Sequence, residues 1–380
     1  MVLFMVATAA TPGGWCSAPL YRFALYRLKL TWNKKGKWMS AQPVRLGIAG
    51  LGRLGRRHAE NLARRVAGVE LLAACSPIED ELRWANAQLG IAHCYRDYAD
   101  MLRHPGLDAV FLVTPTTLHA TQITQALGAG KHVFCEKPLS LAVDDCERVQ
   151  RAAAEQPHLQ VMIGFVRRFD ASYRDAYTRI TQGAIGTPFL VRAQTCDRLD
   201  PSGAFVQFAA SSGGIFLDCS VHDIDLARWL LGAPRALRAF AIGTNAIYPK
   251  LREFNDVDNG LALCEFDDGK LACFYASRTM AHGHDTWTEV VGTAGKLVIG
   301  RDARPNEVET TDERGTHFDI VQDFYARFAD AFVAEASAFI AAVRGEQSLP
   351  LTLADATEAT RIGQALAQAQ RERRIVDIGA

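Results

Sequence analysis

The sequence lacks a net charge, because its 42 Lys and Arg residues equal its 42 Asp and Glu residues and the pI is near 7.1. A chain without a basic excess has no electrostatic footprint for nucleic acid or for an anionic membrane surface. Long apolar runs are also missing: residues 109–113 are too few, and residues 332–343 are too interrupted, to span a bilayer. We therefore expect neither a nucleic-acid partner nor a membrane partner.

The nine cysteines form no Cys-x-x-Cys pair, their number is odd and their spacing is irregular. Several lie inside apolar strand patterns, where cysteine acts as a small hydrophobic residue. This usage argues against a disulfide scaffold or a structural zinc site and favours a reducing cytoplasm. His282 and His284 flank a glycine, but the sequence offers no third ligand beside them, so we expect no metal.

Residues 1–38 lack acidic residues and carry six basic ones. A signal or transit peptide is one interpretation, but the basic residues follow the apolar stretch, which is the wrong order for secretion. The alternative is an upstream start codon or a disordered leader, with Met39 as the natural start. We expect residues 1–41 to be such a leader, disordered or not native, and the folded protein to begin near Gln42.

An α/β fold is predicted for residues 42–165. Short apolar runs at residues 44–49, 69–75, 109–113 and 132–135 alternate with helical patterns, among them residues 79–89 and 143–154. Strands that alternate with helices in this way indicate a doubly wound parallel sheet. We therefore predict an N-terminal Rossmann dinucleotide-binding domain over residues 42–165.

The pattern changes after residue 165, and we predict a second, α+β domain over residues 166–380. Its expected strands form a large, mostly antiparallel open sheet and cover residues 189–193, 260–266, 269–275, 287–292 and 296–299. A long helix is expected at residues 214–231 and two amphipathic helices at residues 321–343 and 352–371. The uncovered face of such a sheet is an association surface.

A Gly-x-Gly-x-x-Gly loop follows the first strand and opens a helix, which is the context that identifies a dinucleotide site. Gly50 permits the tight turn, Gly52 lets a pyrophosphate approach the backbone, and Gly55 lets the helix pack on the strand. The second strand ends in Ser76, where an acidic residue usually binds the ribose. The acidic residues 79–81 that follow disfavour a 2′-phosphate. We therefore expect NAD, with NADP left open.

Lys137 stands at the carboxyl end of a buried strand, between Glu136 and Pro138. Open α/β sheets bind their ligands at this end of the strands. We assign these residues to the cofactor site: Gly50, Leu51, Gly52, Arg53, Leu54, Gly55, Ser76, Thr114, Pro115, Thr116, His119, Glu136 and Lys137.

Asp218 and His222 are four residues apart in the predicted helix and would share one face. A carboxylate beside an imidazole orients the ring and tunes its pKa, and such a pair accepts the proton of an alcohol during oxidation. Asp225 could also reach back to His222. The alternative is a surface helix pair without a catalytic role.

These motifs occur in the order of one known family. Gly50–Gly55 with His58, then residues 114–119, Glu136-Lys137-Pro138, Gly213-Gly214, and Asp218 with His222 resemble the glucose–fructose oxidoreductase / inositol dehydrogenase / MocA family. The resemblance covers residues 43–378. Residues 164–170 and 281–283 are similar to the myo- and scyllo-inositol dehydrogenase group.

The resemblance implies a catalytic set of Lys137, Asp218 and His222, with Arg167 contacting a polyol. We expect substrate contacts from Lys137, Arg167, Asp197, Arg198, Asp218, His222 and His282. The expected activity is NAD-dependent oxidation of myo- or scyllo-inositol to a keto-inositol by a homodimer or homotetramer. Three alternatives remain: a dehydrogenase of another sugar or a dihydrodiol, an NAD-dependent glycosidase, and a non-catalytic dinucleotide-sensing regulator, which should lack Lys137 or His222.

Overall fold

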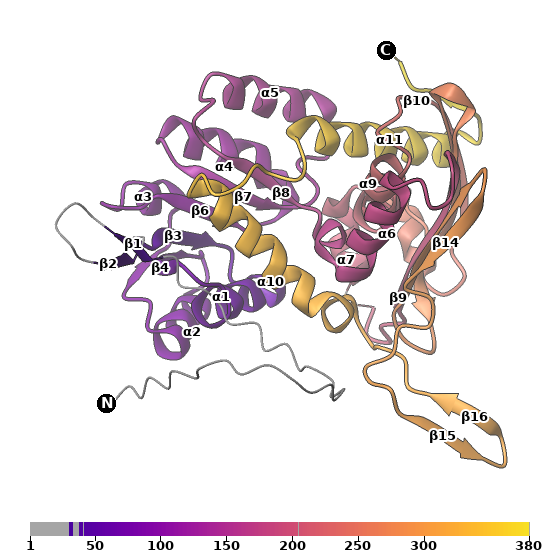
Figure 1. Cartoon of the computed structure of the whole chain (residues 1–380), viewed down its shortest axis with the longest axis horizontal. Helices are drawn as coiled ribbons and strands as arrows, with labels where there is room; N and C mark the ends of the chain where they lie inside the picture. The colour runs from indigo at the N-terminus through magenta and orange to yellow at the C-terminus, as the bar shows by residue number, and fades with distance from the viewer. Residues whose placement is uncertain (1–29, 33–37, 41, 204, 380) are drawn as a thin grey trace, which may run out of the picture. The chain divides into compact units, whose positions relative to one another are not determined.

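The computed structural model describes residues 30–32, 38–40, 42–203 and 205–379 (Figure 1). Contacts divide the chain into two units, Met1–Gln42 and Pro43–Ala380. In the first unit, β1 (Leu30–Trp32) pairs antiparallel with β2 (Trp38–Ser40). Most of the predicted leader lies outside the described residues, so that expectation stays a prediction. No helix among the described residues has both the length and the apolar character to cross a membrane.

The first sheet of the second unit is parallel throughout, with the order β5-β4-β3-β6-β7-β8. Its strands are β3 (Val44–Ala49), β4 (Val69–Cys75), β5 (His93–Tyr95), β6 (Ala109–Leu112), β7 (His132–Glu136) and β8 (Val161–Gly164). Every residue of β6 and β8 is buried, because helices cover both faces of the sheet, and this explains the continuous apolar runs in the sequence. The predicted doubly wound parallel sheet is confirmed.

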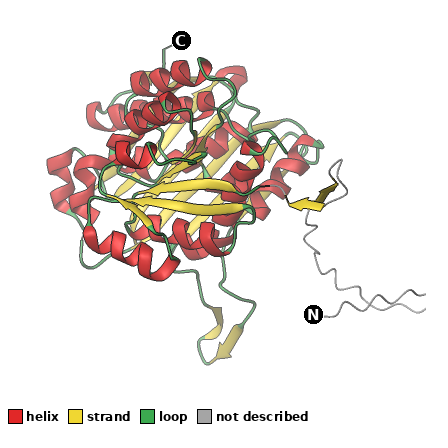
Figure 2. Cartoon of the chain, turned by 90° about the vertical axis from the view of Figure 1, so that its left-hand side faces the viewer, coloured by secondary structure: helices red, strands yellow, loops and turns green. Residues whose placement is uncertain are grey.

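The helices of this sheet lie in two layers. They are α1 (Arg53–Arg64), α2 (Glu79–Leu89), α3 (Tyr98–Leu102), α4 (Thr116–Gly128) and α5 (Val143–Ala154). Figure 1 shows α1 and α2 on one side of the strands and α4 and α5 on the other. Figure 2 shows the same strands, in yellow, between the red helices. The carboxyl ends of the strands therefore remain accessible at the edge where the loops to α1 and α4 begin.

The second sheet is mixed and mostly antiparallel, with the order β14-β13-β9-β12-β11-β10-β17. Its strands are β9 (Pro188–Arg198), β10 (Ala236–Thr244), β11 (Asn259–Phe266), β12 (Leu271–Met280), β13 (Asp285–Gly292), β14 (Gly295–Ile299) and β17 (Val376–Asp377). β9 and β12 run parallel and the other neighbours run antiparallel. The predicted large, mostly antiparallel sheet is confirmed, although β10 was not foreseen. A separate hairpin of β15 (Glu309–Asp312) and β16 (Gly315–Phe318) projects from this part of the chain (Figure 1).

The remaining helices lie in the chain after the parallel sheet, and several of them contact strands of the second sheet. They are η1 (Val166–Phe169), α6 (Ala171–Thr181), α7 (Phe205–Ser212), α8 (Ile215–Asp218), α9 (Val221–Leu230), η2 (Pro249–Phe254), η3 (Asp267–Gly269), α10 (Phe324–Val343) and α11 (Leu353–Glu372). α11 contacts α5 of the first part as well as α8, α9 and β10 of the second. α10 likewise contacts both α1 and η1.

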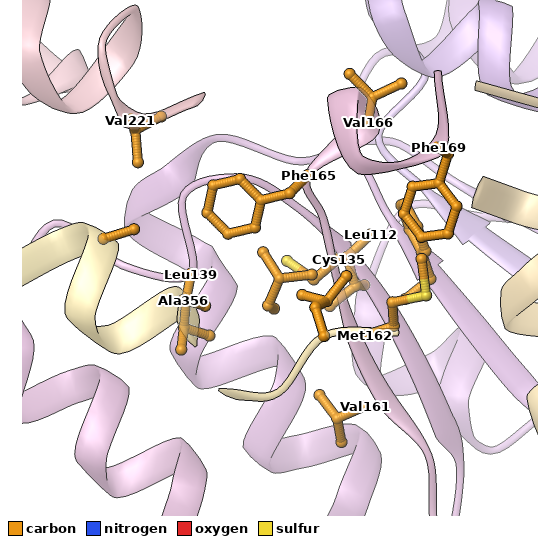
Figure 3. Packing of buried hydrophobic residues seen from close by; sticks show 14 of the residues in the cluster. Leu112, Cys135, Leu139, Val161, Met162, Phe165, Val166, Phe169, Val221 and Ala356 are labelled. Atoms are coloured by element: carbon orange, nitrogen blue, oxygen red, sulfur yellow. The ribbon is translucent and has the colours of Figure 1, made fainter. Parts of the chain in front are cut away.

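One apolar core runs between the two sheets. Figure 3 shows Leu112, Cys135 and Met162 of the parallel sheet beside Phe165 and Phe169 of the η1 segment. All of these side chains are buried and belong to one cluster, which also contains Val221 of α9 and Ala356 of α11. This shared core holds the parallel strands against η1 and against helices that follow the first strand of the second sheet.

The predicted helix over residues 214–231 is wrong in one respect, because the structure divides it into α8 and α9. α8 ends at Asp218, and α9 begins at Val221. The Asp218 carbonyl accepts a hydrogen bond from Lys137 Nζ at 2.8 Å. A tertiary contact from the residue after β7 thus uses a backbone acceptor that an unbroken helix would have used internally.

Candidate active site

A cavity of about 710 Å³ lies between the carboxyl ends of the parallel strands and the second sheet. Of the residues predicted for the site, it is lined by Arg53, Leu54, Thr114, Pro115, Thr116, His119, Glu136, Lys137, Arg167, Asp197, Arg198, Asp218 and His222. Gly50, Leu51, Gly52, Gly55, Ser76 and His282 do not line it. The structure therefore brings the predicted catalytic set together with part of the predicted cofactor set.

The glycine loop is built as a phosphate cradle requires. Gly50 has φ +90°, and a Cβ there would lie 2.3 Å from the Val113 carbonyl oxygen. A Cβ on Gly55 would lie 2.1 Å from the Gly50 oxygen, so neither position tolerates a side chain. At Gly52, in contrast, the nearest atom to such a Cβ is 4.0 Å away. The loop is open at Gly52.

The first turn of α1 has no acidic residue, and no side chain caps its N-terminus at Gly52. Its leading N–H groups are therefore available to an anion at the positive end of the helix dipole. The open glycine and the uncapped helix together fit the pyrophosphate of a dinucleotide. Arg53, which lines the cavity beside this turn, adds a positive charge.

Lys137 is held over the cavity by two groups of Asp218. Its Nζ donates to the Asp218 carbonyl at 2.8 Å and to Oδ1 of the same residue at 3.3 Å. The backbone N–H of Lys137 donates to Glu136 Oε2 at 3.1 Å, and the peptide bond to Pro138 is cis. The side chain of Lys137 is only 17% exposed, so its ammonium is presented to the cavity rather than to bulk solvent.

Asp218 is the centre of a buried charge chain. Arg278 donates through Nη2 to Asp218 Oδ2 and through Nη1 to Asp256 Oδ2, each at 2.9 Å. Asp256 Oδ1 then accepts the N–H of Ile215, at the start of α8, at 2.8 Å. Burial raises the pKa of Asp218, but Lys137 and Arg278 outweigh burial, so the pKa lies below its ordinary value. Asp218 is therefore an ionised carboxylate.

His222 lines the same cavity without the partner that the sequence pattern predicted. Its Nδ1 is buried and has no hydrogen-bond partner among the described residues. Asp218 bonds Lys137 and Arg278, and Asp225 forms a bidentate pair with Arg168 at 2.6 and 2.8 Å. The break between α8 and α9 removes the shared face that the predicted Asp218–His222 pair required. Burial, and then Arg167, Lys137 and His284, hold the pKa of His222 well below its usual range. The ring is a neutral base.

Arg167 lines the cavity from η1, but much of its guanidinium is engaged in protein contacts. It donates to Asp223 at 2.6 Å and to the Thr195 hydroxyl at 2.8 Å, and Thr195 in turn donates to Asp223. Burial raises the pKa of Asp223 despite the neighbouring Arg167. Arg167 thus joins Asp223 and Thr195 in a buried polar cluster at the wall of the cavity.

His284, and not His282, lies in the cavity wall. His282 is half-exposed and its nearest acidic partner is Asp285 at 3.7 Å. His284 is buried, with Nδ1 3.1 Å from Asp197 Oδ1 and Nε2 2.8 Å from the Thr286 hydroxyl. Asp197 is 41% exposed and lines the cavity, so His284 orients a carboxylate in the cavity wall.

His119 joins the two loops at the edge of the parallel sheet. One ring nitrogen is 2.8 Å from the Pro138 carbonyl and the other is 2.9 Å from the Thr114 carbonyl. Burial lowers the pKa of His119, against the opposing effect of these carbonyls. The residue thereby fixes the loop of Lys137 against the turn at Thr114.

A second group of titratable side chains is buried around Glu136, the residue before Lys137. His58 Nε2 and Glu136 Oε1 are 2.7 Å apart, and Glu335 of α10 lies close enough that one polar atom of each residue falls within 4.8 Å of the others. Both Glu335 oxygens are buried without a hydrogen-bond partner among the described residues. Burial, and then Glu136, raise the pKa of Glu335 well above its ordinary value, so this carboxyl is protonated.

Several residues of the wall were missed in the sequence. They include Thr195, Leu199, Phe205, Phe208, Arg278, His284 and Phe328. A usable signal existed for Arg278, because an arginine two residues after the apolar run of residues 272–276 must find a partner inside the fold. The aromatic residues of α7 carried no comparable signal.

Comparisons with known proteins agree with the order of the two sheets along the chain. A family described as "Oxidoreductase family, NAD-binding Rossmann fold" matches residues 44–165, and "Oxidoreductase family, C-terminal alpha/beta domain" matches residues 178–378. The chain is 38% identical over 320 residues to the scyllo-inositol 2-dehydrogenase (NAD(+)) of Bacillus subtilis, covering 84% of this chain and 92% of that protein. It is 31% identical to the myo-inositol 2-dehydrogenase of Thermotoga maritima, covering 88% and 98%.

Among solved structures, scyllo-inositol dehydrogenase from Lactobacillus casei with bound NAD(H) and scyllo-inositol is similar with a TM-score of 0.86 and 39% identity. The match covers 89% of this chain and 100% of that one. The predicted family and the predicted NAD cofactor are thereby confirmed. The chain belongs to the glucose–fructose oxidoreductase / inositol dehydrogenase / MocA family of NAD-binding oxidoreductases.

Proposed function

We propose that the protein oxidises one hydroxyl of a cyclitol, scyllo-inositol or myo-inositol, to the corresponding keto-inositol, with NAD as the oxidant. The observation that carries this proposal is the joint placement of Lys137, Asp218 and His222 in one cavity at the edge of the glycine-loop sheet. The similar proteins named for scyllo- and myo-inositol support the choice of substrate.

Each of the three residues has a role that its surroundings allow. His222 is neutral and lines the cavity, so the imidazole can take the hydroxyl proton as general base. Such assistance typically contributes about 10²–10⁴-fold to the rate. Lys137 donates to the reacting oxygen and stabilises its developing negative charge. NAD, when bound, accepts the hydride.

Asp218 acts by holding Lys137. Because Arg278 keeps the Asp218 carboxylate ionised and in place, Lys137 Nζ has a fixed partner before substrate arrives. The Lys137 ammonium retains a further N–H for the substrate oxygen, since each ammonium has three. Asp218 is thus expected to orient the lysine, and the predicted orientation of His222 by Asp218 is not part of the proposal.

The polar wall suits a neutral, hydroxyl-covered ring. A buried hydroxyl without a partner costs about 1–3 kcal/mol, so a cyclitol needs charged and polar groups on several sides. Asp197, Arg198, Asp218 and His222 face the cavity together with Lys137. Arg167 also lines the cavity and adds a further polar group to its wall.

The proposal is tested by a panel of NAD reduction assays with scyllo-inositol, myo-inositol, glucose and xylose, and by a separate assay of aryl-glycoside hydrolysis. We expect NADH formation with at least one inositol and none of comparable efficiency with glucose or xylose. Faster NADH formation with a sugar would assign another substrate, and glycoside release would assign a glycosidase. No reduction of NAD or NADP by any polyol at millimolar concentration would refute hydride transfer.

We also propose a homodimer or homotetramer in the cytoplasm. The face of the second sheet opposite its helices carries half-exposed apolar side chains on neighbouring strands: Phe189, Ile242, Leu261, Leu263 and Leu271. A contiguous apolar face of this kind is an association surface. Light scattering that gives a monomeric mass would contradict the oligomer. The free cysteines of the described residues support a reducing compartment.

A further inference from the structure

The end of β4 is where a Rossmann fold usually places a carboxylate against the ribose of the adenosine. This chain has Ser76 there, and the serine is only 1% exposed. Its hydroxyl donates to Glu81 Oε2 and accepts the Ile78 N–H at 3.1 Å. The serine is therefore engaged within the protein, and its main effect is to hold the carboxylate of Glu81.

Glu81 differs from the other acidic residues in the first turn of α2. Glu79 pairs with Arg96, and Asp80 pairs with Arg83, in contacts that are exposed to solvent. Glu81 instead turns toward the glycine loop. Its Oε1 lies 4.0 Å from the position that a Cβ on Gly52 would occupy, and it is the nearest atom to that position.

The glycine loop, and not the acidic turn, locates the ligand here. Gly52 is the open position of a loop in a matched NAD-binding domain, and the pyrophosphate approaches the backbone at this residue. The adenosine ribose follows the pyrophosphate, toward the end of β4. A carboxylate held beside Gly52 and anchored at the end of β4 therefore lies at the ribose.

We propose that Glu81, positioned by Ser76, is the carboxylate that contacts the adenosine ribose of NAD and selects NAD over NADP. A carboxylate accepts hydrogen bonds from the ribose hydroxyls and repels the 2′-phosphate of NADP. The proposal deepens the assignment of the cofactor site. It rests on NAD binding and is independent of which polyol is oxidised.

Arg56 is the cation that competes with this assignment. It lies on α1, donates from Nε to the Leu51 carbonyl at 3.3 Å, and stacks over Trp84 with its guanidinium 4.9 Å from the ring centre. If Arg56 dominated the field at the ribose, a 2′-phosphate would be favoured. The relative affinity of the protein for NADH and NADPH therefore shows whether Glu81 or Arg56 dominates the electrostatic field at the ribose.

The test is equilibrium binding of NADH and of NADPH to the full chain, followed by nucleotide fluorescence. We expect the unmodified protein to bind NADH more tightly. Glu81→Gln keeps the shape and removes the charge, so it should weaken NADH binding by about tenfold to a hundredfold and narrow the preference over NADPH. Glu79→Gln, in the same turn, should change neither affinity.

A rescue variant separates a local effect from a loss of folding. Ser76→Asp in the Glu81→Gln background places a carboxylate directly at the end of β4 and should restore the preference for NADH. The proposal is overturned if Glu81→Gln keeps the ratio of NADH to NADPH affinity of the unmodified protein, or if Glu79→Gln lowers that ratio as much as Glu81→Gln does. It is also overturned if the unmodified protein binds NADPH more tightly than NADH. Tight, selective NADH binding without polyol oxidation would instead refute the proposed function and leave Glu81 assigned.

Discussion

Replacing Arg278 by methionine should strongly destabilise the protein, because it removes the cation between a buried carboxylate, Asp256, and a partly buried one, Asp218. Arg278 is 6% exposed at its side chain and makes two charge-assisted hydrogen bonds of 2.9 Å, to Asp218 and Asp256. Such bonds contribute about 1.5–3 kcal/mol each. Asp218 is 24% exposed, so solvent screens its share, whereas Asp256 is 3% exposed. We expect a loss of about 3–5 kcal/mol, as for breaking a buried pair.

The measurement is urea unfolding at pH 7, followed by far-ultraviolet circular dichroism and extrapolated to water. The matched control is Arg238→Met. Arg238 lies on β10 of the same sheet and pairs with Glu265, but both side chains are well exposed, and such pairs contribute about 0–1 kcal/mol. The stability deficit of Arg278→Met should shrink as the pH falls, because Arg278 holds the pKa of Asp218 below its ordinary value and this contribution is lost when Asp218 takes up a proton. Equal losses for the two variants would refute the charge chain as a determinant of stability.

Two further predictions concern pH. The pKa of His222 lies well below its usual range, so protonation of His222 should not lower kcat/KM as the pH falls from 8 to 6.5. A fall in kcat/KM with its midpoint at or above pH 6.5 would contradict the assignment of His222 as a neutral base. Glu335 holds its proton in the folded state and releases it in the unfolded state above its ordinary pKa near 4.3, so its share of stability falls as pH rises from there. Glu335→Gln cannot ionise, so its free energy of unfolding should rise relative to that of the unmodified protein between pH 5 and 8. A difference between the two free energies that does not change with pH would disprove the protonated carboxyl.

Local pattern was sufficient for much of the fold. The predicted bounds of the strands at residues 44–49 and 69–75 and of the helices at residues 79–89 and 143–154 match β3, β4, α2 and α5. These elements are set by apolar runs and by helix termini that are local in sequence. The helix over residues 214–231 was not predictable in the same way, because its break coincides with a contact from Lys137, 81 residues earlier.

The candidate site likewise contains residues that local motifs predict and residues that depend on tertiary structure. The motifs placed Lys137, Asp218 and His222 in one cavity, and their chemical roles remain predictions. Arg278 reaches Asp218 only through the register of β12, and the choice between His282 and His284 depends on which face each occupies after the strand ends. The proposed contact of Glu81 with the ribose could be inferred only once the turn from Ser76 into α2 was seen.

The most direct test of the central claim compares NADH formation from scyllo-inositol and myo-inositol by the unmodified protein and by Lys137→Ala, with NADH binding measured on the same preparations. Lys296→Ala, at an exposed lysine that pairs with Glu289, is the control. The account predicts NADH formation by the unmodified protein and by the control, and a loss of turnover by orders of magnitude in Lys137→Ala while NADH binding persists. Normal turnover without Lys137, or no NADH formation by the unmodified protein with either inositol, would contradict it.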